Sequence, residues 1–160
     1  MNPIRKTYGT TEVQITSFQS SKGITEYHIF FQQTDSMEDF RTQLQHIQDV
    51  HARSVEELPG NPVAIFRRYF LSDVTNQTDE LMERERLSPY CALSIVQQAP
   101  MNGTKIALWA WLQTGVQTQV LPSGLFEARH GAYGQLLGAN LCNRAANSEY
   151  QTRLIFRDYI

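Results

Sequence analysis

The 160-residue sequence has few cysteines, little charge and no long hydrophobic run. Its opening residues, MNPIRKTYGTTEVQ, lack the apolar core of a signal peptide, and no apolar stretch approaches the ~20 residues of a membrane span. The two cysteines, Cys91 and Cys142, fall in apolar, strand-like segments, where a buried reduced thiol is commoner than a disulfide. We therefore expect a cytoplasmic protein.

Residues that would bind nucleic acid, metal or phosphate are also scarce. The net charge is −2, so no basic excess attracts nucleic acid or an anionic membrane. His46 and His51 are five residues apart and do not share a helical face, and no histidine pair has zinc-ligand spacing. The glycines of 131–138 precede no helix directly and lack the Lys-Ser/Thr of a phosphate loop. No nucleic-acid partner, membrane, metal or cofactor is predicted.

The strongest local pattern lies between Pro89 and Leu112. Two apolar runs, Ala92–Val96 and Ile106–Leu112, are joined by a segment that ends in Asn102-Gly103. Asn-Gly between apolar runs predicts a β-hairpin, because both residues tolerate the positive φ of a tight turn. The second run is almost continuously apolar, which is typical of a central strand that is covered on both faces.

The rest of the first 113 residues alternates between strand and helix patterns. Strands are predicted at 11–18, 26–32, 63–71, 92–96 and 106–112. A helix capped by Asp35 or Ser36 carries Phe40, Leu44, Ile47 and His51 on one stripe, and a second, capped by Asn76 or Thr78, covers Asp79–Leu87. The order β-β-α-β-α-β-β predicts an α+β sandwich with two helices on one face of a mostly antiparallel or mixed sheet.

The pattern changes after Gln113. Leu121–Gly124 is typical of a linker, and Leu125–Cys142 contains apolar residues interrupted by glycines. Asn147-Ser148 precedes a helical stripe at Tyr150 and Leu154 that has no stop signal before Ile160. We expect either that this helix docks on the body or that the chain is a piece of a longer one.

Several of these segments resemble the YjgF/Rid family of reactive-intermediate deaminases, also labelled endoribonuclease L-PSP. The order of elements is similar, with Arg67–Asp73 (RRYFLSD) closing the third strand and Cys91 early in the fourth. Gly131–Gln135 (GAYGQ) is similar to the Gly-Pro-Tyr-Ser-Gln that opens a Rid domain. Glu149–Arg153 (EYQTR) is similar to the Glu-Glu-Gln-Thr-Arg of its first helix.

The resemblance implies a fold and a domain layout. Residues 1–120 would form a Rid/chorismate-mutase-like sandwich. Residues 121–160 would form a linker with the first strand and helix of a second, incomplete copy. This tandem layout resembles that of chorismatase-like proteins. Rid-like domains form trimers, or pseudo-trimers when copies are fused, so the resemblance implies an oligomer.

The resemblance also implies which site residues to compare. In a deaminating Rid domain, an arginine two residues before the cysteine binds the substrate carboxylate, and here that position is Pro89. A glutamate on the last strand orients the hydrolytic water, and here that position is Trp109. Only Cys91 is retained, and Tyr133 matches a substrate-site tyrosine. Because proline has no donor and tryptophan is neither acid nor base, the first copy is expected to have no catalytic residue.

The residues themselves leave alternatives open. Arg67 and Arg68 point to opposite faces of their strand. Either one of them binds an anion in an intersubunit cleft, or they pair with Asp73 or the Glu83/Glu85 helix, or an arginine lies at a sheet edge. Trp109 shares a face with Trp111, where the two rings either stack on a ligand or form core or oligomer interface. Cys91 has no base nearby in the sequence, which favours a structural thiol over a nucleophile. The candidate substrate-binding residues are Arg67, Tyr90, Cys91, Trp109 and Tyr133.

Two functions are consistent with these patterns. The first is a non-catalytic N-terminal Rid-like domain of a larger two-copy enzyme that acts on a small carboxylated metabolite, serving as scaffold and interface. The second is a free-standing Rid-like enamine or imine deaminase, or a small-molecule-binding protein, in which Tyr133 completes the site. We expect a small carboxylate as the ligand in either case.

Overall fold

The computed structural model of the chain describes residues 3–131, 133–138 and 153. The chain divides into two compact units, Met1–Gly115 and Val116–Ile160. The predicted C-terminal helical stripe at Tyr150 and Leu154, its Asn147-Ser148 cap and Cys142 lie outside the described residues. None of the helices in the described part of the chain is both long and apolar enough to cross a membrane.

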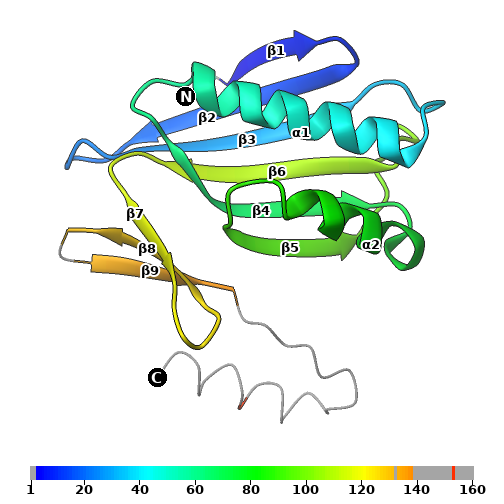
Figure 1. The fold of residues 1–160 in the computed structure, drawn as a ribbon. Helices are drawn as coiled ribbons and strands as arrows, with labels where there is room; N and C mark the ends of the chain where they lie inside the picture. Colours follow the sequence, from blue (N-terminus) through cyan, green and yellow to red (C-terminus); the bar gives the residue numbers. More distant parts are fainter. Residues whose placement is uncertain (1–2, 132, 139–152, 154–160) are drawn as a thin grey trace. The chain divides into compact units, whose positions relative to one another are not determined.

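The first unit is a six-stranded sheet with two helices on one face (Figure 1). Its strands are β1 Ile4–Tyr8, β2 Thr11–Gln19, β3 Thr25–Gln33, β4 Val63–Leu71, β5 Ala92–Gln97 and β6 Ile106–Gln113, and its helices are α1 Phe40–Glu57 and α2 Val74–Glu85. The strand order is β1-β2-β3-β6-β4-β5, and only the β4–β5 pair is parallel. This confirms the predicted α+β class and the mixed sheet with two helices, to which β1 is an addition.

The predicted hairpin between β5 and β6 is wrong. β4 lies between these two strands, because the β4–α2–β5 crossover places β5 on one side of β4 and β6 pairs with its other side. The end of β4 is hydrogen-bonded on both sides, from Gln98 N to Leu71 O and from Ser72 N to Lys105 O. The Asn102-Gly103 turn therefore reverses the chain across the end of β4, and β6 is central as predicted.

Both helices begin at an aspartate that the sequence patterns did not select. The Asp39 carboxylate accepts a hydrogen bond from Thr42 N (2.8 Å) and caps α1, whereas Asp35 caps only the preceding turn. The Asp73 carboxylate accepts from Asn76 N (3.2 Å), so α2 begins at Val74, directly after β4. Side-chain oxygens at the N-cap position accept hydrogen bonds from the free N–H groups of the first helical turn. In both helices, an aspartate directly before the first helical residue occupies this position.

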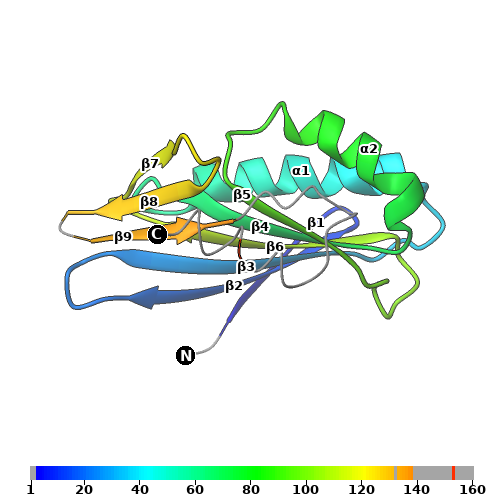
Figure 2. The same ribbon diagram turned by 90° about the horizontal axis from the view of Figure 1, so that it is seen from below.

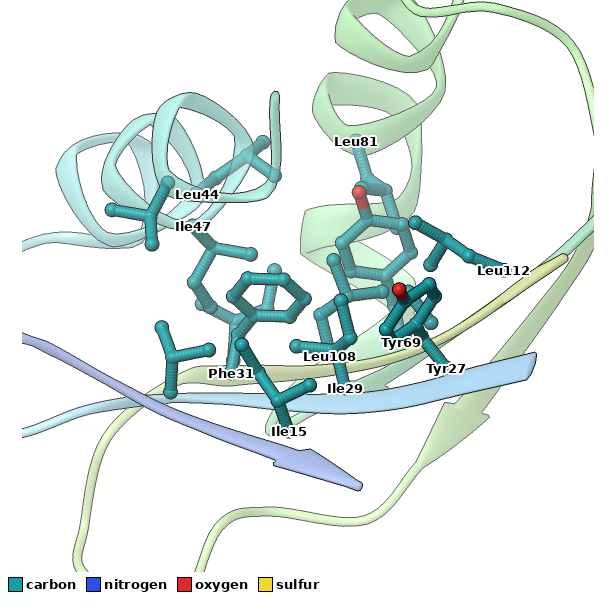
Figure 3. Close-up of a cluster of buried hydrophobic side chains, with 14 of the residues drawn as sticks. Ile15, Tyr27, Ile29, Phe31, Leu44, Ile47, Tyr69, Leu81, Leu108 and Leu112 are labelled. Atoms are coloured by element: carbon teal, nitrogen blue, oxygen red, sulfur yellow. The ribbon is translucent and has the colours of Figure 1, made fainter. Parts of the chain in front are cut away.

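The hydrophobic core lies between the helices and the sheet (Figure 3). In Figure 2 both helices lie on the same side of the six-stranded sheet, which we call the helix side. The predicted α1 stripe supplies Leu44 and Ile47, and α2 supplies Leu81, all fully buried. Alternate strand residues such as Phe31 and Leu108 complete the core, since period-two alternation sends one set of side chains to each face. We call the opposite face the open side.

One close backbone approach in this unit predicts a stability effect. Gly60 has φ +87°, and a Cβ added there would lie 2.8 Å from Thr114 Cγ2. Thr114 cannot move away freely because its Oγ1 accepts a hydrogen bond from Thr25 N (2.9 Å). Gly60→Ala is expected to lower the free energy of unfolding by about 2 kcal/mol, measured by urea denaturation. Gly23→Ala is the control, since Gly23 has a similar φ but open space around it; an equal loss there would contradict the steric argument.

The second unit contains a three-stranded antiparallel sheet in the order β7-β8-β9. Its strands are β7 Gln117–Val120, β8 Phe126–His130 and β9 Tyr133–Leu137. The predicted linker at 121–124 is a hairpin turn, closed by hydrogen bonds from Leu121 N to Leu125 O and from Gly124 N to Leu121 O (both 2.8 Å). Because β7 pairs with β8, the first compact unit ends at Gly115.

Candidate functional site

The five candidate substrate-binding residues do not meet at one place. Arg67 and Cys91 are buried and lie close together on the helix side of the first unit. Trp109 lies on the open side of the same sheet, and Tyr90 is largely exposed in the segment before β5. Tyr133 belongs to β9 in the second unit, where its backbone pairs with His130. The structure therefore forms two separate clusters of interest in the first unit, one on each face.

The helix-side cluster is centred on a buried ion pair. Arg67 Nη2 donates to Glu85 Oε2 (2.8 Å) and to Pro89 O (2.9 Å), and the hydroxyl of Tyr69 donates to Glu85 Oε1 (2.5 Å). Arg67 and Tyr69 come from β4, and Glu85 comes from the last turn of α2. Arg67 is only 3% exposed. Of the alternatives left open for the two arginines, pairing with the Glu83/Glu85 helix is what the structure shows for Arg67, with Glu85 as the partner.

Cys91 lies beside this pair with an unreactive thiol. Burial raises its pKa to about 11; nearby Arg67 lowers the pKa and Glu85 raises it. The thiol contacts Ala92 O at 3.4 Å and is not in a disulfide. A thiol with this pKa is protonated at neutral pH and is a poor nucleophile, because the thiolate is the attacking species. The environment supports the structural interpretation of Cys91.

His51 reaches the same region from α1. Its ring contacts Phe31 with 5.6 Å between centroids, and the side chain is buried. Burial, and secondly the positive charge of Arg67, lowers its pKa to about 3. His51 is therefore neutral at physiological pH, and its Nε2 has no hydrogen-bond partner within the described structure. The helical stripe predicted the burial of His51, but only the three-dimensional contact shows that Arg67 lies near it.

The open-side cluster is built from aromatic rings and one arginine. The Arg68 guanidinium lies 5.3 Å from the centroid of Phe66 and 5.8 Å from that of Trp109. Arg68 Nε donates to Ser94 Oγ (3.1 Å) on β5. A guanidinium over aromatic faces is held by cation–π attraction, which is favourable where water is partly excluded. The prediction that Arg67 and Arg68 point to opposite faces is confirmed.

His28 stacks against both tryptophans of β6. Its ring centroid lies 5.8 Å from that of Trp109 and 5.6 Å from that of Trp111, with interplanar angles of 10° and 16°. Trp109 and Trp111 therefore share a face, as predicted. The sequence patterns left His28 isolated, because its neighbours come from the pairing of β3 with β6, where His28 lies opposite Trp111.

These rings form a continuous surface that we call the aromatic face. Phe66 packs on Trp109 with 5.5 Å between centroids, and Phe30 packs on Phe70 at 6.2 Å. The aromatic face consists of Phe30, Phe66, Phe70, Trp109 and Trp111, from strands β3, β4 and β6. Of these, Phe30 is 38% exposed. Such a surface can bury a partner by apolar contact but offers few proton donors or acceptors for chemistry.

Comparison of the chain with protein-family models, with curated proteins and with solved structures gave no match. The similarity to the YjgF/Rid family therefore stays a prediction from the sequence. Among the described residues, no three or more histidine, cysteine, aspartate or glutamate side chains are grouped in a way that could hold a metal ion. The two clusters of the first unit are the basis for the functional proposal.

Proposed function

We propose that the first unit is a non-catalytic scaffold domain that assembles with further copies of this chain through the aromatic face. The observation that carries the proposal is the continuous set of rings on the open side of the sheet, spread over three strands. Both helices cover the other side of this sheet. Within the described residues of the first unit no helix covers these half-buried rings, and such surfaces are typical of those that bind a partner.

The composition of the face supports a protein partner. Tryptophan, phenylalanine and arginine are enriched at the centres of protein interfaces, where their large surfaces are buried and desolvated. Trp109 lies near the centre of the face, between Phe66 and His28, and Arg68 covers its ring. In this arrangement, the Arg68 guanidinium is held by cation–π contacts with aromatic rings rather than by a carboxylate, as at the centre of some protein interfaces.

A second copy of the chain fits the charges around the face. Arg68 on β4 is positive, while Glu26 on β3 is negative and lies across the sheet from it. A neighbouring copy related by rotation can bring its acidic side to Arg68, which is how a self-complementary interface pairs charges. The small net charge of −2 gives little repulsion between copies.

The catalytic alternative has less support in the described residues. A deaminase that uses Cys91 needs an accessible, reactive thiol, and this thiol is buried with a pKa raised to about 11. Arg67, the buried arginine nearby, is already bound by Glu85 and Pro89 O. The ionisable groups near Cys91 therefore support a structural role for this side of the sheet.

The oligomeric state tests the proposal. The full chain at about 100 μM, analysed by size-exclusion chromatography with light scattering, is expected to elute as an oligomer, since that concentration detects micromolar dissociation constants. Trp109→Arg is expected to convert it to a monomer, because the new charge lies beside Arg68 and must be desolvated on assembly. The mass of the wild-type oligomer distinguishes a dimer from the trimer that the Rid resemblance implies.

Two further variants keep this test interpretable. Phe70→Lys adds a charge at another position of the aromatic face and is also expected to give a monomer, with the wild-type circular dichroism spectrum. Met37→Lys is the control, because Met37 is 88% exposed in the segment before α1, away from the face. A monomeric wild-type chain, or variants of the face that remain oligomeric, would contradict the proposal.

A further inference from the structure

A cavity of about 360 Å³ opens on the first unit where β1, β2 and β3 lie side by side. It is lined by residues 5–7 of β1, residues 12–14 of β2, and Phe30 and Gln32 of β3. Its volume is within the range of pockets that bind small molecules. The cavity lies beside the aromatic face and shares only Phe30 with it.

Strand register brings six of the lining side chains together in two rows. Arg5 pairs with Gln14, which pairs with Phe30, and this forms one row across the three strands. Thr7 pairs with Glu12, which pairs with Gln32, and this forms the next row. Buried Val13 and Ile15 flank Gln14 along β2 and face the core, so alternation turns Gln14 and both rows to the open side.

Three charged residues line the cavity, and one of them, Lys6, pairs with Glu57 (3.6 Å). The other two, Arg5 and Glu12, are available for a ligand. Neither Arg5 nor Glu12 takes part in any ion pair or hydrogen bond between side chains that the described structure contains. They occupy diagonal positions on neighbouring strands, where residues are within reach of one small molecule. An unpaired arginine offers a planar fork for a carboxylate, and an unpaired glutamate attracts an ammonium group.

The remaining lining groups add apolar and hydrogen-bonding surface. Phe30 supplies a ring that is 38% exposed, on which an apolar or aromatic group can lie. The amides of Gln14 and Gln32 and the hydroxyl of Thr7 both donate and accept hydrogen bonds. The cavity therefore combines opposite charges, flexible polar groups and one aromatic ring. This combination matches a small molecule that carries both charges and an apolar part.

We propose that this cavity binds a zwitterion of the α-amino-acid class. Arg5 holds the ligand carboxylate, Glu12 holds the ammonium group, and the ligand side chain lies on Phe30. The cavity uses β1–β3 and shares only Phe30 with the aromatic face, whereas the proposed assembly is centred on β4 and β6. The sequence patterns could not place this site, because β1 was not predicted and the rows exist only through strand pairing.

Binding is tested on the full chain with the twenty common amino acids as probes, by NMR chemical-shift changes at up to about 10 mM ligand. We expect at least one amino acid with an apolar or aromatic side chain to shift the amide signals of β1–β3. Removing one charge from the ligand checks the geometry. For a phenylalanine ligand, phenylpropionate lacks the ammonium group and phenethylamine lacks the carboxylate, and each is expected to bind about tenfold more weakly.

Variants then assign each charge. Arg5→Gln is expected to abolish the preference for phenylalanine over phenethylamine, because phenethylamine lacks only the carboxylate that Arg5 holds. Glu12→Gln is expected to abolish the preference for phenylalanine over phenylpropionate, which lacks the ammonium group that Glu12 holds. Arg41→Gln, on the exposed surface of α1, is the matched control and is expected to bind as the wild type does. Neither cavity variant is expected to change the oligomer mass, which separates this proposal from the assembly. The absence of shifts with every amino acid, or unchanged preferences in both cavity variants, would overturn it.

Discussion

Replacing Glu85 by alanine is expected to lower the free energy of unfolding by about 3–5 kcal/mol. The carboxylate is the acceptor for both Arg67 Nη2 and the Tyr69 hydroxyl, and all three side chains are buried. Without it, a guanidinium and a phenol remain in the core without their charged partner, and buried polar groups that lose a partner bear the full cost of desolvation. Urea denaturation at pH 7, followed by circular dichroism, measures the change.

Two further variants distinguish the effect of leaving Arg67 buried without its partner from the effect of simply removing a carboxylate. Glu80→Ala removes the carboxylate of the exposed Arg41–Glu80 pair between the two helices, and is expected to have little effect because exposed pairs contribute little. The triple variant Arg67→Met, Tyr69→Phe, Glu85→Leu is expected to recover most of the loss, since apolar groups of similar volume leave no unpaired charge. If Glu85→Ala behaves like Glu80→Ala, the buried network is not a major source of stability.

The sequence predicted the positions of the strands in the first unit better than it predicted which strands pair with each other. Val63–Leu71 was predicted with the bounds that β4 has, because dense β-branched and aromatic residues are a local signal. The pairing of β5 with β6 was wrong, because a turn signal such as Asn102-Gly103 says that the chain reverses but not which strands it joins. The insertion of β4 between them depends on a long-range crossover, which short-range patterns do not encode.

The candidate site shows the same division between local and long-range information. Alternation along one strand was enough to predict that Arg67 and Arg68 face opposite ways. The sequence patterns named the Glu83/Glu85 helix only as one of several possible partners, and the fold selected Glu85 for Arg67. The stacking of His28 on two tryptophans and the cavity at Arg5 were not predicted, since both need the register between strands. Register follows from which faces are buried, and that is decided by the whole fold.

His51 is expected to make the protein less stable in acid. Its pKa is lowered to about 3 in the folded protein, chiefly by burial and secondly by Arg67, from an ordinary value of 6.5. The unfolded chain therefore binds a proton at a pH where the folded protein does not, so the free energy of unfolding falls as pH decreases below 6.5 toward 3. Between pH 6.5 and 5, where carboxylates of the unfolded chain stay mostly ionised, the loss from His51 is about 2 kcal/mol.

The variant His51→Gln isolates this contribution. Glutamine keeps a neutral polar side chain at every pH, so the variant is expected to lose most of the pH dependence between 6.5 and 5 in urea denaturation. His46→Gln, which replaces a partly exposed histidine on the same helix, is the control for the substitution itself. If His51→Gln folds poorly, the His51 ring signals of the wild-type protein can be followed by NMR. A ring that titrates near pH 6.5 in the folded state would show that the burial of His51 does not hold it neutral.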